Sequence, residues 1–112
     1  MPTNELAKVV GRNISTARRL LGLTQAQLAE RLELGQDALS RMEKGLIAPK
    51  MGRLRDLAAA LDCTVADLFR EPEDGARERA ASIADMLRPL SPQAQEAILE
   101  TVAQMARVMR GC

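Results

Sequence analysis

The chain has 112 residues, of which 46% are hydrophobic and 28% are charged, and its formal net charge is +1. This length and composition are typical of one small soluble domain, or of one domain with an appended element, and exclude a disordered polypeptide. The chain contains no histidine, no Cys-x-x-Cys pair and no apolar run near the ~20 residues of a membrane-spanning helix. A zinc protein and a membrane protein are therefore not expected.

The composition also predicts the fold class. Phe69 is the only aromatic residue, so the core has to consist of aliphatic side chains and Met, which suit close helix packing. No strand-type run of β-branched and aromatic residues occurs, and we predict an all-α protein. The first ten residues lack the layout of a signal peptide, which favours a reducing cytoplasm. Cys63 is expected to be a small buried hydrophobic residue and Cys112 a free thiol at the chain end.

The first predicted helix covers residues 4–21. Apolar residues recur along it at spacings of three and four, which places them on one helical face that should pack in the core: Leu6, Val10, Ile14, Ala17 and Leu21. Gly22 is a suitable residue to end this helix. Arg19 is expected to be exposed to solvent.

Two short helices, 25–32 and 36–44, follow with a tight connection between them. Thr24 is a good N-cap for the first of them, and Leu34 should point inward from the connection. Leu39 and Met42 form an apolar underside on the second helix, whose opposite face carries a polar row: Gln36, Asp37, Ser40, Arg41 and Lys44. A helix of this kind can rest on a core and enter a DNA major groove.

Further helices are predicted at 52–61, 65–69, 76–87 and 92–110. The segment 71–75 is acidic, contains Pro and Gly and lacks apolar residues, so it is the expected linker between a domain at 1–70 and a C-terminal helical segment at 76–112. Ala80, Ile83, Ala84 and Leu87 should form the apolar face of helix 76–87. The last helix carries a heptad-like stripe: Ile98, Val102, Met105 and Met109.

Several short motifs occur in a fixed order within residues 8–70. They are Gly11-x-x-Ile14, Arg18, Gly22-Leu23-Thr24-Gln25, Leu28-Ala29, Leu39-Ser40, Glu43-Lys44-Gly45 and Pro49. Their ordered combination resembles the Xre/Cro/phage-repressor family of helix-turn-helix transcriptional regulators. The resemblance implies a five-helix, lambda-repressor-like DNA-binding domain, followed here by a two-helix C-terminal extension.

The resemblance places Gln36, Asp37 and Arg41 toward base edges, with Ser40 beside them. Their chemistry suits this role, because a Gln amide pairs with adenine, Arg donates twice to guanine, and a carboxylate accepts from the cytosine amino group. Any solvated helix face is also polar, so a plain surface role is the alternative for these residues. For Asp37 it is a strong one, since an acidic residue also suits a helix N-terminus.

Other residues are expected to contact phosphates or to support helix 36–44, here called the reading helix. The resemblance gives Gln25 a phosphate contact and pairs Arg18 with Glu43 in an ion pair that orients helix 36–44. The cations around or after that helix, Lys44, Lys50 and Arg53, are candidate phosphate contacts. Residues 1–70 carry a net charge of +3 and residues 71–112 a net charge of −2, which favours nucleic-acid contact by the N-terminal part.

These observations predict a sequence-specific transcriptional regulator, most simply a repressor, that binds a palindromic site on double-stranded DNA as a homodimer. Residues 76–112 would form the dimer through Ile98, Val102, Met105 and Met109. Three alternatives stay open: C-terminal helices that only enlarge the N-terminal core, an antitoxin or other regulator whose C-terminal helices hold a different protein, and an interaction module without DNA binding. The sequence implies no cofactor and no enzyme, since it lacks a phosphate loop and clustered catalytic groups.

Overall fold

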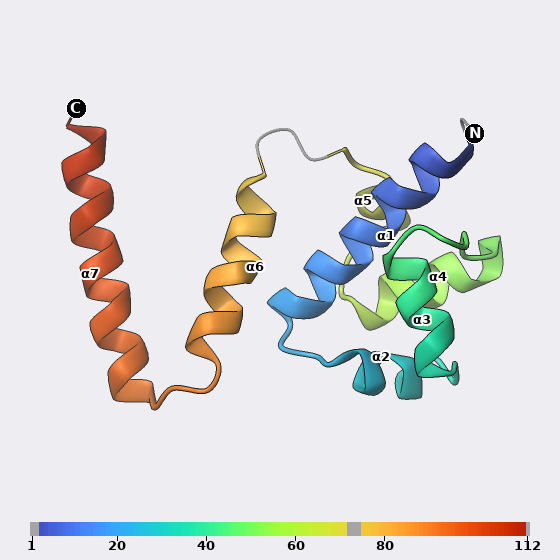
Figure 1. The fold of residues 1–112 in the computed structure, drawn as a ribbon, viewed down its shortest axis with the longest axis horizontal. Helices are drawn as coiled ribbons and strands as arrows, with labels where there is room; N and C mark the ends of the chain where they lie inside the picture. The colour runs from blue at the N-terminus through green and yellow to red at the C-terminus, as the bar shows by residue number, and fades with distance from the viewer. Residues whose placement is uncertain (1–2, 72–74, 112) are drawn as a thin grey trace.

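The computed structural model describes residues 3–71 and 75–111, and over these residues the chain forms seven α-helices and no strand (Figure 1). In chain order the helices are α1 (Thr3–Leu20), α2 (Gln25–Arg31), α3 (Gln36–Glu43), α4 (Met51–Ala60), α5 (Val65–Leu68), α6 (Ala76–Leu87) and α7 (Pro92–Arg110). The predicted all-α class is confirmed. Residues 72–74 of the expected linker and Cys112 lie outside the described residues.

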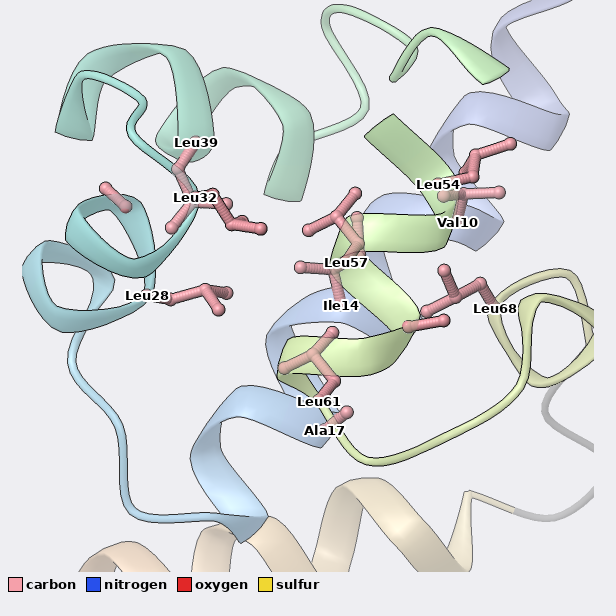
Figure 2. Close-up of a cluster of buried hydrophobic side chains, with 12 residues drawn as sticks. Val10, Ile14, Ala17, Leu28, Leu32, Leu39, Leu54, Leu57, Leu61 and Leu68 are labelled. Atoms are coloured by element: carbon pink, nitrogen blue, oxygen red, sulfur yellow. The ribbon is translucent and has the colours of Figure 1, made fainter. Parts of the chain in front are cut away.

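Helices α1 to α5 enclose one hydrophobic core (Figure 2). Its five most completely buried large side chains come one from each of these helices: Ile14, Leu28, Leu39, Leu57 and Leu68. Burial of one such side chain contributes roughly 1.5–3 kcal/mol. Each of the five helices is therefore held to the others by at least one fully buried anchor.

The buried stripe of α1 is shorter than its sequence pattern predicts. Val10, Ile14 and Ala17 are buried, but the side chains of Leu6 and Leu21 are 52% and 47% exposed. The prediction that these two leucines lie in the core is wrong. Leu6 lies near the start of α1 and Leu21 follows its last residue, so both lie at the ends of the stripe.

Local hydrogen bonds shape the connection that runs from α1 through α2 to α3. The Thr24 hydroxyl accepts from the backbone N–H of Gln27 at 3.0 Å, and the Gln27 side chain accepts from the N–H of Thr24 at 2.9 Å, so the two residues cap the start of α2 reciprocally. Glu33 turns the chain after α2 with a left-handed φ of 54°. This turn directs Leu34 inward, where it packs against the core.

The two C-terminal helices take up different positions (Figure 1). Helix α6 lies along α1 and buries Ala81 completely. Of the predicted apolar face, Ala80 and Ile83 are exposed, and Ala84 and Leu87 are half-buried. The predicted face is therefore covered only in part. The fully buried residue of α6 is Ala81, which the pattern did not include, and polar contacts to α1 complete the interface. Helix α7 forms a separate arm and buries no residue.

Candidate nucleic-acid interface

Helix α3 presents the expected polar row to solvent. Gln36, Asp37 and Arg41 are exposed and Ser40 is half-buried, while Leu39 and Met42 are buried on the opposite side. Residues three and four apart share a helix face, so these polar side chains form one strip along α3. The strip offers an amide, a carboxylate, a hydroxyl and a guanidinium, which together can donate to and accept from the edges of base pairs.

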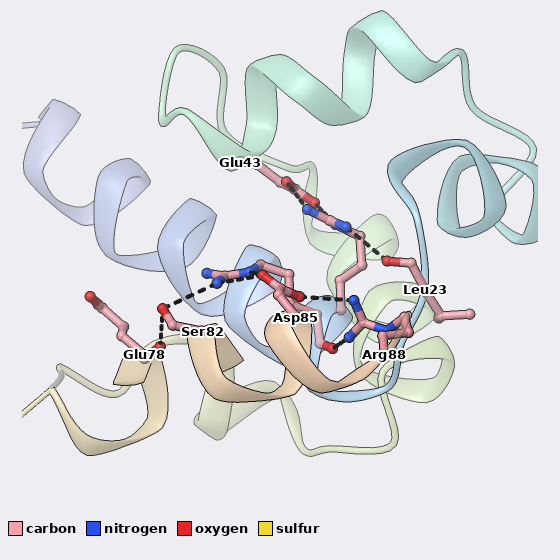
Figure 3. A network of polar contacts seen from close by, with 8 residues as sticks. Leu23, Glu43, Glu78, Ser82, Asp85 and Arg88 are labelled. Atoms are coloured by element: carbon pink, nitrogen blue, oxygen red, sulfur yellow. Dashed lines mark hydrogen bonds and ion pairs between the residues drawn. The ribbon is translucent and has the colours of Figure 1, made fainter. Parts of the chain in front are cut away.

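The end of α3 is anchored to α1 by an ion pair with two hydrogen bonds. Arg18 donates from Nε to Glu43 Oε2 at 2.6 Å and from Nη2 to Glu43 Oε1 at 3.1 Å. The two side chains are only 13% and 5% exposed. Arg18 Nη1 also donates to the carbonyl oxygen of Leu23 at 2.8 Å (Figure 3). One guanidinium thus joins the end of α3 to the segment that leads into α2.

The same carboxylate holds the residue at the start of α2. Gln25 Nε2 donates to Glu43 Oε1 at 2.9 Å, so the side chain expected to contact a phosphate is already hydrogen-bonded within the protein. The Gln25 side chain therefore sits beside the Arg18–Glu43 pair at the N-terminus of α2, where the helix dipole favours an anion. It is half-buried, so part of the side chain faces solvent.

A close contact of α1 with α3 sets the position of α3. Gly11 packs directly on the backbone at the end of α3: a Cβ atom at this position would lie 2.2 Å from the carbonyl oxygen of Met42 and 2.8 Å from that of Glu43. Only glycine fits there. The sequence pattern contains Gly11 as part of a motif, but its packing role needs the tertiary structure.

The three candidate phosphate-contacting cations have different surroundings. Lys44 follows α3 and is exposed, and Lys50 is exposed at the N-terminus of α4. Arg53 is half-buried and donates from Nη1 to the carbonyl oxygen of Leu32 at 2.7 Å. Arg53 therefore links α4 to the end of α2, and its guanidinium is less available to a phosphate than the two lysine side chains.

Arg19 lies in a contact that the sequence did not indicate. Its side chain is 27% exposed, and its guanidinium is 2.7 Å from Asp85 Oδ2 on α6. Arg88 donates to Asp85 Oδ1 at 2.9 Å and to the carbonyl oxygen of Arg19 at 2.7 Å (Figure 3). The pKa of the Asp85 carboxyl is lowered mainly by the hydrogen bond from the Arg88 side chain, and next by the one from the Arg19 side chain. The prediction of a plain exposed Arg19 is therefore wrong.

Other chemistry is sparse in the part of the chain that the structure describes. No three His, Cys, Asp or Glu side chains within it are grouped so as to hold a metal ion. Cys63 is partly buried and packs against the core, and this burial is the main cause that raises the pKa of its thiol. None of the described helices is both long and apolar enough to cross a membrane.

The five-helix core, the tight α2–α3 connection and the anchored polar row on α3 define a helix-turn-helix protein. A family model described as "Helix-turn-helix" matches residues 14–68. An uncharacterized HTH-type transcriptional regulator of Sinorhizobium fredii is 36% identical over 70 residues, which are 62% of this chain and 91% of the relative. The chain belongs to the family of HTH-type transcriptional regulators, and the resemblance seen in the sequence is confirmed.

A second relative matches a slightly shorter stretch of the chain. An uncharacterized HTH-type transcriptional regulator of Methanothermobacter thermautotrophicus is 38% identical over 61 residues, which are 54% of this chain and 88% of the relative. No solved structure matches the chain significantly. Both curated relatives are matched over most of their own length, yet the matched residues are well short of this chain's full length.

Proposed function

We propose that the protein is a sequence-specific DNA-binding repressor that places α3 in the major groove of its operator. The observation that carries this proposal is that α3 presents a polar row to solvent while the Arg18–Glu43 ion pair anchors the C-terminal end of the same helix. An anchored helix holds its side chains in a fixed register, which base-edge hydrogen bonds require. Gln36, Asp37, Ser40 and Arg41 are the proposed base contacts.

Phosphate contacts would hold the helix in place. Lys44 and Lys50 are exposed after the reading row, and Gln25 is half-buried at the start of α2. Arg53 is the weakest member of the expected set because its guanidinium already binds a backbone carbonyl. Repression is the simplest outcome, since a protein that occupies a promoter excludes polymerase without any further domain.

A homodimer on a palindromic operator follows from the size of the reading helix. One α3 covers only a few base pairs, and useful specificity in this class comes from two copies on two half-sites. Helix α7 offers the pairing surface: Ile98, Val102, Met105 and Met109 are 38%, 41%, 53% and 67% exposed and follow a heptad-like spacing. An uncovered apolar stripe of this kind marks an interaction surface, and we propose a second copy of the chain as its occupant.

The experiment that tests this function combines two measurements on the full chain. Light scattering gives the mass of the protein, and selection from random-sequence duplexes gives the DNA that it prefers. A dimer that enriches a palindrome supports the proposal and defines the half-site. A monomer that enriches no sequence contradicts it and directs attention to a different protein on α7, as in an antitoxin or another partner-binding regulator.

Arg41 provides the most direct test of base reading. We expect Arg41→Ala to keep the fold, because the side chain is exposed, and to lose discrimination at one base pair by ~1–3 kcal/mol. Affinities for single-base-pair variants of the selected duplex measure this change. An unaltered preference at every position would remove Arg41 from the base-reading set.

A further inference from the structure

A groove of about 320 Å³ lies where α1, the end of α3 and α6 meet. Its charged lining comes from all three helices and the residue after α3: four basic side chains, Lys8, Arg12, Arg19 and Lys44, and two acidic ones, Glu43 and Glu78. The hydroxyl residues Ser15 and Thr16 complete its polar surface. The proposed base contacts lie outside this groove. The sequence pattern drew attention to Arg19, Glu43 and Lys44 in its lining, but not to Lys8, Arg12 or Glu78.

The charges of the groove are not balanced internally. Glu43 is neutralised by Arg18, which does not line the groove, and Arg19 is paired with Asp85. Arg12 and Glu78 are 3.8 Å apart, with side chains 49% and 44% exposed, and such an exposed pair is weak.

Lys8 and Lys44 are the two remaining basic residues of the groove. Among the ion pairs of the described residues, neither Lys8 nor Lys44 has an acidic partner. The two lysines and the weakly paired Arg12 leave the groove with an excess of positive charge, which favours an anionic ligand.

The groove continues the surface of the reading helix. Lys44 follows Arg41 by three residues and Ser40 by four, so it extends their face, and it also lines the groove. Lys8 lies directly against the turn after α3, because a Cβ atom at Gly45 would come within 2.7 Å of its Cγ. A DNA strand that passes the end of α3 would therefore have Lys44, Lys8 and Arg12 together on one side.

We propose that this groove binds phosphate groups of the DNA backbone next to the base pairs that α3 reads, with Lys8 and Arg12 as contacts beside Lys44. The inference rests on the proposed DNA-binding function and extends its contact surface to α1 and the edge of α6. Glu78 opposes this binding, because its carboxylate attracts Arg12 and repels a phosphate. The groove adds affinity without sequence information, since phosphates are common to all base pairs.

The test uses Lys8→Ala and Arg12→Ala with two probes: the duplex selected by the wild-type protein and a scrambled duplex of equal length. Each lost phosphate contact should reduce the slope of log affinity against log salt by about 0.9, or about 1.8 for a dimer. The double variant should bind both duplexes about tenfold more weakly at low salt. Arg70→Ala, which removes an exposed cation outside the groove, is the matched control and should leave the slope unchanged.

Glu78→Gln should have the opposite effect on the affinity for DNA. It removes the opposing charge and frees Arg12, so it should bind both duplexes several-fold more tightly without a change in sequence preference. Equal slopes for wild-type protein, Lys8→Ala and Arg12→Ala, with helical content intact by circular dichroism, would overturn the groove proposal alone. Failure of the wild-type protein to prefer any duplex would instead overturn the proposed function.

Discussion

At the scale of single residues, Glu43 is the side chain that anchors the end of α3. It is almost fully buried and accepts from both Arg18 and Gln25, so one carboxylate connects α1, the start of α2 and the end of α3. A buried carboxylate is stable only while its partners are present. We therefore expect the pair to act through the position of α3, and not through its own contact with a base.

We expect Arg18→Ala to lower the free energy of unfolding by ~3 kcal/mol, because the Glu43 carboxylate is left buried without its cation. Denaturant unfolding at neutral pH measures the loss. Arg55→Ala, which truncates an exposed arginine on α4, is the control and should change stability by less than ~0.5 kcal/mol. Full stability of Arg18→Ala combined with lost DNA binding would mean that Arg18 contacts DNA directly.

At the scale of helices, the approach of α1 to α3 and the docking of α6 on α1 determine how the elements fit together. The first depends on the missing side chain of Gly11, and the second on Ala81 and the Asp85 contacts. Both interfaces use small residues because close backbones leave no room for larger ones. The spacing of apolar residues and the capping residues predict where a helix begins and ends. They do not predict which small residue faces another helix.

Two alanine substitutions separate packing from helix propensity. Gly11→Ala should destabilise the protein by ~1–3 kcal/mol, because its Cβ overlaps carbonyl oxygens of α3. Gly52→Ala should stabilise it by ~0.5–1 kcal/mol, because this α4 glycine has open space around it and alanine favours the helix. Thermal or denaturant unfolding of both variants checks the contrast. A similar effect of both substitutions would contradict the close α1–α3 contact.

The docking of α6 should depend on pH through Asp85. The pKa of this carboxyl is lowered in the folded state by hydrogen bonds from Arg88 and Arg19, so its stabilising effect is present at neutral pH and is lost as the pH falls below about 4. Asp85→Asn should therefore be less stable than wild type at pH 7. The two unfolding free energies should converge toward pH 2, whereas a difference that persists in acid would rule out the charge as its source.

At the scale of the whole molecule, α6 and α7 have separate roles. Helix α6 is part of the N-terminal unit, because it packs on α1 and its Arg88 binds the carbonyl oxygen of Arg19 near the end of that helix. Helix α7 has no buried residue and leaves its apolar stripe open. A dimer formed through α7 would transmit its geometry to α3 through α6 and α1.

Removal of residues 91–112 tests this division. The shortened chain should remain folded, should have the mass of a monomer by light scattering, and should bind the selected duplex about 100-fold more weakly, since the second half-site is no longer tethered. A chain that ends at Arg70 should also lose stability, because it lacks the α6 contacts. An unchanged dimer mass without α7 would contradict the proposed pairing surface.

The sequence by itself determined the all-α class, the seven helices and the polar row of α3. These features depend on local signals: a helical repeat of apolar residues, caps such as Thr24, and chain-turning residues such as Gly22. The Arg18–Glu43 pairing was foreseen only through resemblance to a family. Its partners lie 25 residues apart, and no local pattern connects them.

Only the tertiary structure decided which side chains share a surface. In the folded chain, Gln25 donates a hydrogen bond to Glu43 and Arg53 donates one to the carbonyl oxygen of Leu32. Arg19 pairs with Asp85, which lies 66 residues further along the sequence. The tertiary structure also docked α6 on α1 while α7 stayed free, although both helices carry apolar faces in the sequence. The physical reason is that such contacts depend on the fit between distant surfaces, whereas helix formation depends on neighbours within one or two turns.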